Sequence, residues 1–216
     1  MAIFSLFGMG NGYGQTTFTS NVANGDYNVA GSWIETGTND LDNIPDANDI
    51  VIILSGHNIS LTANESALTL TIEDGGTLTV DPGTSITAGT MTVDGGGTYI
   101  HNRDGGSITT ATWAVTSNCQ ITGTTGTFPA NMSQNFGNLT FNIPAGLGNV
   151  GLNQSLTTQN NLTVLDASPG RIEVSADGTS RSVTVGGDFI MSGGNFRLND
   201  DVGGATMTVA GDITQS

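Results

Sequence analysis

The residues of this chain with the clearest catalytic potential are His101 and Arg103, which lie two positions apart in His101-Asn-Arg-Asp104. A polysaccharide lyase needs a basic residue that abstracts the proton beside a sugar carboxylate, and this segment contains suitable groups. The segment is followed directly by Gly105-Gly106, and polar residues before glycines are typical of turns. We therefore interpret it as a polar turn.

A second candidate is the pair of adjacent carboxylates in Asn199-Asp-Asp201, because glycoside hydrolases act through two carboxyl groups. Adjacent side chains of a strand point to opposite faces, so Asp200 and Asp201 would not converge there. Ser55-Gly-His57 and Arg171-Ile-Glu173 only partly match the elements of galacturonase-like enzymes, since Asn58 follows the histidine and the lysine is missing. We assign no catalytic residue and no cofactor-binding residue.

Calcium is the metal that the sequence favours, because the densest acidic stretch, Asp40 to Asp49, offers the oxygen ligands that Ca²⁺ prefers. The stretch lacks the central glycine and the final glutamate of an EF-hand, so we interpret it as a solvated loop, and calcium binding is the alternative. A zinc site is not expected from one cysteine and two separated histidines. The candidate calcium ligands are Asp40, Asp42, Asp46 and Asp49.

The composition restricts the partners and the kinds of covalent link. Four Lys and Arg against 19 Asp and Glu give a net charge of −15, and the four cations are all arginine. So few cations cannot neutralise the phosphates of a nucleic acid or of an anionic membrane, and we expect neither binding to nucleic acid nor insertion into a membrane. The single cysteine, Cys119, excludes an intramolecular disulfide, and we interpret it as a small buried hydrophobe.

Short runs in which threonine alternates with an aliphatic residue are the dominant local pattern. This period of two is typical of a strand with one buried face. Groups of Gly, Asp and Asn separate the runs, and such residues form turns. The runs are Leu68-Thr-Leu-Thr-Ile72, Thr77-Leu-Thr-Val80, Thr90-Met-Thr-Val93, Leu162-Thr-Val164, Ser182-Val-Thr-Val185 and Thr206-Met-Thr-Val209.

Two units repeat with an offset of 24 residues: the unit that begins at Ser182 matches the one that begins at Thr206. A repeat of this length made of short strands and turns predicts a β-solenoid, in which each coil hydrogen-bonds to the next. An antiparallel sandwich or barrel would also use short strands, but it would not explain a repeat that preserves register. We expect six side chains of these units to stack inside: Val183, Val185 and Phe189 beneath Met207, Val209 and Ile213.

The composition of the N-terminal third differs from that of the rest, and we expect the whole chain to have three parts. Residues 1–15 resemble the remnant of a secretory signal peptide. Residues 16–67 are expected to form an N-terminal cap and the first coil, with Trp33 against residues 50–61 and a strand at Asp49-Ile-Val-Ile-Ile-Leu54 buried on both faces. Residues 68–216 are expected to form the coils of the solenoid and to continue into further chain.

Several segments resemble the N-terminal region of large secreted bacterial surface proteins, often exported by the type IX system. The resemblance implies an all-β fold, a right-handed parallel β-helix behind a capping segment, and it departs from the family at Tyr27, where a tryptophan is expected. A weaker similarity is to the extracellular G8 domain, through the Gly-His segment. The matching segments are Gly25-Asp-Tyr-Asn28, Ser32-Trp33, Ile44-Pro45, Asp49-Ile-Val-Ile52, Gly56-His-Asn-Ile-Ser-Leu61 and Asn138-Leu-Thr140.

The resemblance also implies a function at the outer cell surface or in the secreted state. We expect a structural or adhesive β-helix scaffold whose partners are polysaccharides or cell-surface glycans of a host. The alternative is a polysaccharide lyase or glycoside hydrolase built on a β-helix. A groove with converging carboxylates, arginine and histidine would favour the enzyme, and a smooth flank of threonine and asparagine would favour the scaffold.

Overall fold

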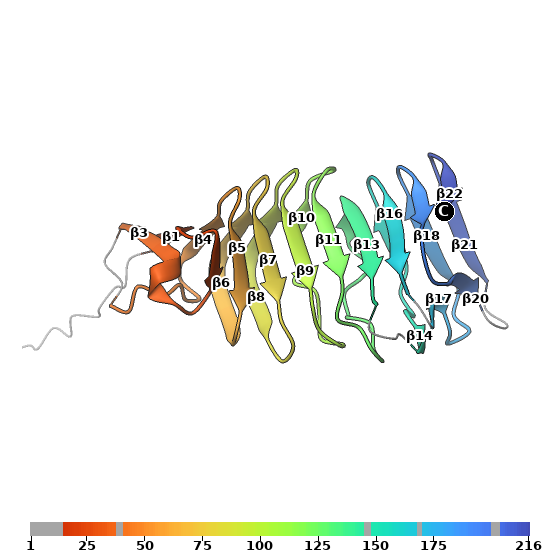
Figure 1. Ribbon diagram of the computed structural model, residues 1–216, viewed down its shortest axis with the longest axis horizontal. Helices are drawn as coiled ribbons and strands as arrows, with labels where there is room; N and C mark the ends of the chain where they lie inside the picture. Colours follow the sequence, from red (N-terminus) through yellow and green to blue (C-terminus); the bar gives the residue numbers. More distant parts are fainter. Residues whose placement is uncertain (1–14, 38–40, 145–147, 168–169, 200–203) are drawn as a thin grey trace, which may run out of the picture.

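The chain is wound into a right-handed parallel β-helix of about seven turns, closed at its N-terminal end by a capping segment (Figure 1). The structure is a computed structural model that describes residues 15–37, 41–144, 148–167, 170–199 and 204–216. The predicted fold class is confirmed. Over these residues no helix is long or apolar enough to cross a membrane.

The strands are short and follow one another around the helix axis. The capping segment also contains a short 3-10 helix, η1 (Ala30–Ser32). The strands are β1 (Thr16–Ser20), β2 (Asn24–Asp26), β3 (Trp33–Gly37), β4 (Ile50–Ile53), β5 (Asn58–Leu61), β6 (Asn64–Ile72), β7 (Thr77–Val80), β8 (Ser85–Val93), β9 (Thr98–His101), β10 (Thr112–Trp113), β11 (Asn118–Ile121), β12 (Asn135–Phe136), β13 (Asn138–Asn142), β14 (Asn149–Gly151), β15 (Leu156–Thr158), β16 (Leu162–Asp166), β17 (Arg171–Ser175), β18 (Arg181–Val185), β19 (Phe189–Met191), β20 (Phe196–Asn199), β21 (Ala205–Val209) and β22 (Ile213–Gln215).

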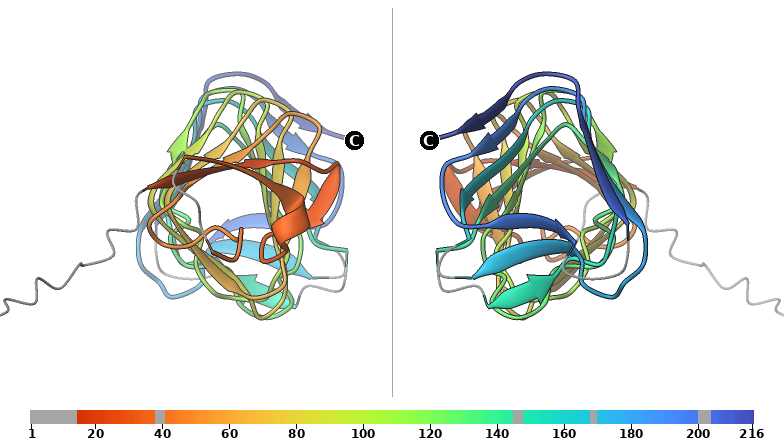
Figure 2. Two further views of the ribbon diagram at one scale, coloured as in Figure 1. Left: turned by 90° about the vertical axis from the view of Figure 1, so that its left-hand side faces the viewer. Right: turned by 90° about the vertical axis from the view of Figure 1, so that its right-hand side faces the viewer.

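Three flanks surround the core, as the views along the axis show (Figure 2). One flank is a continuous sheet from β2 and β5 to β22, with nine strands in the described residues. The second carries β4, β6, β8 and β10 and then, after a break in the pairing, β12, β15, β18 and β21. The third is formed by β14, β17 and β20 in the last coils and by the first halves of β6 and β8 in the early ones.

The alternating runs form strands because each wall of the β-helix has one dry face and one wet face. In β7, Leu78 and Val80 are buried, while Thr77 and Thr79 are partly exposed. The same rule corrects one prediction: β4 is not buried on both faces, since Val51 and Ile53 point inward but Ile50 and Ile52 remain partly exposed. A single-layer wall has no second layer to cover its outer side.

The predicted stacking of the two repeated units is confirmed in register. Strands β18 and β21 pair in parallel with Val183 beside Met207 and Val185 beside Val209, and Phe189 pairs with Ile213. Val183, Val185 and Phe189 are buried, whereas Met207 and Val209 are only partly buried against the core. The prediction that all six side chains lie inside is wrong for Ile213, which is 70% exposed because no further coil covers it in this structure.

The offset of 24 residues is not a constant period. Paired residues are 19 apart between β4 and β6, 21 between β6 and β8, 27 between β16 and β19 and 24 between β19 and β22. Strand pairing keeps the coils aligned, whereas the loops between flanks differ in length and absorb the difference.

A column of Asn and Asp side chains joins successive coils at the corner between the second flank and the nine-stranded sheet. The backbone N–H of Asn161 donates to Oδ1 of Asn138 at 3.2 Å, that of Asp188 to Oδ1 of Asn161 at 2.8 Å, and that of Asp212 to Oδ1 of Asp188 at 2.8 Å. The two aspartates that the repeat places one above the other are therefore linked through a backbone donor, which offsets part of their repulsion.

The capping segment covers the first coil with an antiparallel pair of strands. Strand β1 pairs antiparallel with β3 on one side and parallel with β4 on the other. Trp33 is 6% exposed, its Nε1 donates to the Tyr27 carbonyl at 2.7 Å, and the two rings meet edge to face at 5.3 Å. Tyr27 in turn bonds to the first coils, donating from its N–H to Ser60 at 2.9 Å and from its hydroxyl to Ser66 at 2.8 Å. Trp33 is thus linked to the first coil through Tyr27.

Candidate functional site

The third flank carries an open groove of about 680 Å³. We call it the Arg103 groove. Its walls come from four successive coils, so residues about 20 positions apart in the sequence lie side by side along it. The lining residues are Asn64, Gly83, Ser85, Ile86, Thr87, Ala88, Arg103, Gly106, Ser107, Ile108, Thr109, Thr110 and Asn131.

The groove exists because regular strand pairing stops on this flank. The first halves of β6 and β8 pair from Asn64 to Ala67, but residues 103–111 of the next coil form no strand. Side chains replace the missing ladder: the Thr109 hydroxyl donates to the Ile86 carbonyl at 2.6 Å, and Nη1 of Arg103 donates to the Thr84 carbonyl. Side-chain hydrogen bonds therefore join the two coils where the strand ladder is missing.

The chemistry of the lining is that of hydroxyl groups, amides and one guanidinium. Ser85 donates to Oδ1 of Asn64 at 2.9 Å, and Nδ2 of Asn131 donates to Oγ1 of Thr110 at 3.0 Å, so these groups are held in place by their neighbours. None of the lining residues, all of which the structure describes, is Asp, Glu, His or Cys. The groove thus offers polar contacts and a positive charge but no general acid or base.

Arg103 differs from two of the other arginines in having no carboxylate partner in the described part of the chain. Arg171 pairs with Glu173 at 3.4 Å, and Arg181 pairs with Asp177 at 2.7 Å. The guanidinium of Arg103 lies across Gly106, where a Cβ atom would come within 2.7 Å of its Cζ. Gly106 also has a φ of +75°, so two independent constraints favour glycine there.

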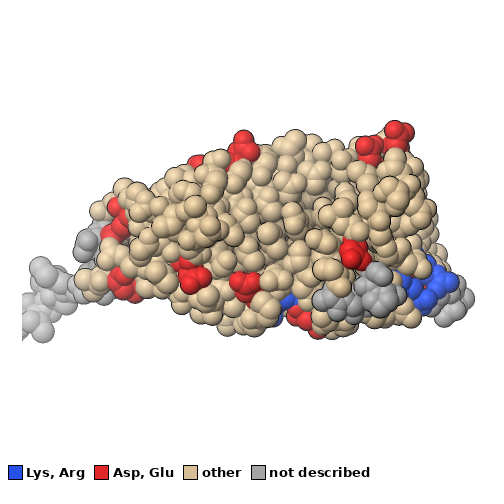
Figure 3. All heavy atoms as spheres, viewed as in Figure 1, with Lys and Arg blue, Asp and Glu red and all other residues tan. Residues whose placement is uncertain are grey.

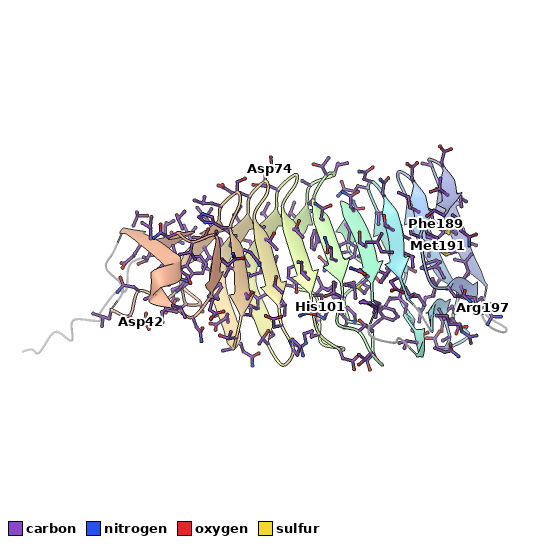
Figure 4. The ribbon with its side chains drawn as sticks, viewed as in Figure 1. Asp42, Asp74, His101, Phe189, Met191 and Arg197 are labelled. Atoms are coloured by element: carbon purple, nitrogen blue, oxygen red, sulfur yellow. The ribbon has the colours of Figure 1, made fainter. Side chains whose placement is uncertain are left out.

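His101 lies inside the β-helix and does not face the groove (Figure 4). Its side chain is fully buried, and its Nε2 donates to the Gly105 carbonyl at 2.8 Å. Burial lowers the pKa of this histidine, so the ring is neutral at pH 7. The structure therefore separates His101 from Arg103: one residue belongs to the core and the other to the surface.

Asp104 organises the next coil. Its Oδ1 accepts the backbone N–H groups of Thr125, Gly126 and Thr127, each at 2.8 Å. These donors lower the pKa of the Asp104 carboxyl, with the Gly126 N–H as the largest cause. The sequence interpretation of this segment as a polar turn holds for residues 102–104, whereas His101 is the last residue of β9 and is buried.

We predict that Asp104→Asn destabilises the protein by about 1 kcal/mol at pH 7, a small value because the carboxylate is exposed to solvent. The folded state lowers the pKa, so this stabilisation is fully present above the ordinary aspartate value of 3.8 and is lost as the pH falls below it. Urea denaturation of wild type and variant at pH 7 and pH 3 measures the difference. An equal difference at both values would contradict the role of the charge.

The candidate calcium ligands lie in the loop between β3 and β4, and Asp40 is outside the described residues. Oδ1 of Asp42 accepts the N–H of Ile44 at 3.0 Å, and Oδ1 of Asp46 accepts that of Asn48 at 2.7 Å. Asp49 is buried, and its Oδ2 accepts the N–H of Asp46 at 2.8 Å. In the described residues no three His, Cys, Asp or Glu side chains converge as a metal site. Calcium at this loop stays a prediction.

The other candidates are dispersed. Asp200 and Asp201 lie outside the described residues. Cys119 is fully buried, which raises the pKa of its thiol, as expected of a structural cysteine. Nδ1 of His57 lies 2.8 Å from the Ser20 hydroxyl, in a contact between the first coil and the capping segment.

Sequence reasoning did not identify the groove as a site. The only available signal was the interruption of the alternating pattern between His101 and Thr112, where the coil continues without a strand. A comparison of the chain with known protein families, with curated proteins and with solved structures found no match in any of the three.

Proposed function

We propose that this protein is a secreted or cell-surface scaffold of structural or adhesive role that binds carbohydrate in the Arg103 groove. The observation that carries the proposal is the lining of the groove, in which fixed hydroxyl and amide groups surround one arginine. Sugars present many hydroxyls, and such groups hydrogen-bond to Ser, Thr and Asn side chains in either direction. An open groove across several coils also suits an extended chain of sugars.

The outer surface supports a scaffold role. The face seen in Figure 3 is largely free of charge, with acidic side chains gathered near its edges and basic ones mainly at the C-terminal end. On the nine-stranded sheet, Asn58, Thr77, Thr98, Asn118 and Asn138 form one outward column in register. A stack of hydrogen-bonded coils with such a surface is stiff and polar, as a spacer between a cell and its surroundings must be. The resemblance to secreted surface proteins supports the proposed location.

The proposal is tested by filling the groove. Thr87 is exposed and lines it, so Thr87→Trp is expected to reduce binding to glycans at least tenfold by occupying the space. Thr208 is exposed on the second flank, and Thr208→Trp serves as the matched control. A glycan array identifies ligands of the wild-type protein, and calorimetric titration then measures their affinity for both variants. Glycan binding that survives Thr87→Trp would refute the groove as the site, and an empty array would refute carbohydrate binding.

We also expect no cleavage of acidic polysaccharides. Elimination needs a base beside the uronate carboxylate, and the groove lining has none. The net charge of −15 further repels a polyanion. Incubation with pectate or alginate should therefore produce no unsaturated products. Products that disappear in His101→Ala or Arg103→Ala would contradict this prediction.

A further inference from the structure

We infer that the Arg103 groove selects an oligosaccharide that carries one carboxylate sugar among neutral sugars, with the carboxylate bound by Arg103. This inference rests on the proposed function and adds the chemical class of the ligand. It explains why an arginine without a carboxylate partner lies in a groove of a strongly acidic protein.

The first support is the electrostatic position of Arg103. The chain has 19 acidic residues against four basic ones, so a carboxylate partner would be easy to find. Arg171 and Arg181 have one, but no carboxylate of the described residues pairs with Arg103. The nearest acid in the sequence, Asp104, has its Oδ1 bound to three backbone N–H groups of the next coil. Arg103 therefore keeps a charge that can pair with a ligand.

The second support is that the guanidinium is held in place before any ligand arrives. Its Nη1 donates to the Thr84 carbonyl, and its plane lies against the bare backbone of Gly106. Its Nε is buried and has no hydrogen-bond partner in the described residues. Its Nη2 also forms no hydrogen bond with the described residues, but this atom is not fully buried. A fixed arginine loses little side-chain entropy on binding an anion, and guanidinium groups match the planar geometry of carboxylates.

The third support limits the ligand to one charge. Arg103 is the only basic residue among the lining residues of the groove. A continuous polyuronate would bring several further carboxylates into the field of a protein with a net charge of −15. Neutral sugars on either side of the acidic one would instead meet the hydroxyls of Ser85, Thr87 and Thr110. The groove thus fits a mixed chain better than a polyanion.

The test compares three probes by calorimetric titration at low salt: a xylo-oligosaccharide with one glucuronic acid, the same oligosaccharide without it, and trigalacturonate. We expect the first to bind at least tenfold more tightly than either of the others, as one charge-assisted contact allows. Methyl esterification of the glucuronic acid should remove the preference while leaving the protein unchanged. Arg103→Gln should bring the ratio of acidic to neutral affinity close to one, and Arg103→Lys should restore part of it.

The outcomes separate the inference from the proposed function. Equal binding of the acidic and neutral probes would overturn the inference and leave carbohydrate binding intact. Binding of neither probe, together with an empty glycan array, would overturn both. A preference that survives esterification or Arg103→Gln would show that Arg103 does not bind the carboxylate, and tight binding of trigalacturonate would overturn the limit to one charge.

Gly106 provides a second test through a positioning residue. A Cβ atom at Gly106 would press on the guanidinium, so Gly106→Ala should lower the ratio of acidic to neutral affinity. Gly56→Ala is the matched control, since Gly56 has nearly the same φ, +77°, but open space around its missing Cβ. Equal ratios in the two variants would contradict the positioning role, whatever both do to stability.

Discussion

Replacement of Trp33 by alanine is expected to destabilise the protein by about 3–5 kcal/mol and to make it self-associate. The indole is 6% exposed and contacts Tyr27 through an edge-to-face ring pair and a hydrogen bond of 2.7 Å. Tyr27 in turn joins the capping segment to the first coils. Loss of the indole therefore loosens the strand pair β1 and β3 that covers the edge of β4, and a bare strand edge pairs readily with other chains.

The matched control is Ile34→Ala on the same strand, because Ile34 is 49% exposed. This control should lower the free energy of unfolding by less than about 1 kcal/mol and leave the association state of the protein unchanged. Chemical denaturation measures the stability, and light scattering measures the self-association. If Trp33→Ala behaved like Ile34→Ala in both measurements, the cap would not depend on this indole.

The second large effect is expected at one rung of the nine-stranded sheet. Phe189 and Ile213 are paired in adjacent coils, yet Phe189 is 8% exposed and Ile213 is 70% exposed. Phe189→Asp should lower the free energy of unfolding by more than about 4 kcal/mol. It removes a buried ring whose centroid lies 5.3 Å from that of Phe196, and it places a charge in the core. Ile213→Asp should lower the free energy of unfolding by less than about 1 kcal/mol.

The damage from Phe189→Asp should also be local, since each coil of a solenoid contacts mainly its neighbours. Hydrogen exchange is expected to show lost protection in β18 to β22 and retained protection in β5 to β9. Similar costs for the two substitutions would mean that Ile213 is buried in solution, and uniform loss of protection would mean that the coils unfold as one unit.

The binding proposals depend on the same stacked architecture. The Arg103 groove has no dedicated loop or domain, and it forms where one coil leaves the strand pairing of the coil before it. Its walls are fixed by the coils on either side, so the site is as rigid as the stack. A scaffold of this kind can present a binding groove without moving parts.

Much of the fold could be predicted because its signal is local. Alternation in Thr77-Leu-Thr-Val80 reports directly which side chains face the core, and β7 occupies those residues. The pairing of Val185 with Val209 followed from a repeat of nearly identical units. The repeat does not keep a constant period, because a change in loop length costs little free energy. Loops of different length can therefore connect strands that pair in the same way.

In the runs where threonine alternates with an aliphatic residue, the sequence by itself determined the strand and, except at Leu68, its dry face, and the repeated units determined that the coils stack in parallel. These properties depend on neighbours within a few positions or on repeated units. Only the tertiary structure decided which polar residues share a surface. It buried His101, left Arg103 in a groove and bound Asp104 to the coil above. The physical reason is that contacts between coils join residues about 20 positions apart, and the loops that set this distance follow no pattern in the sequence.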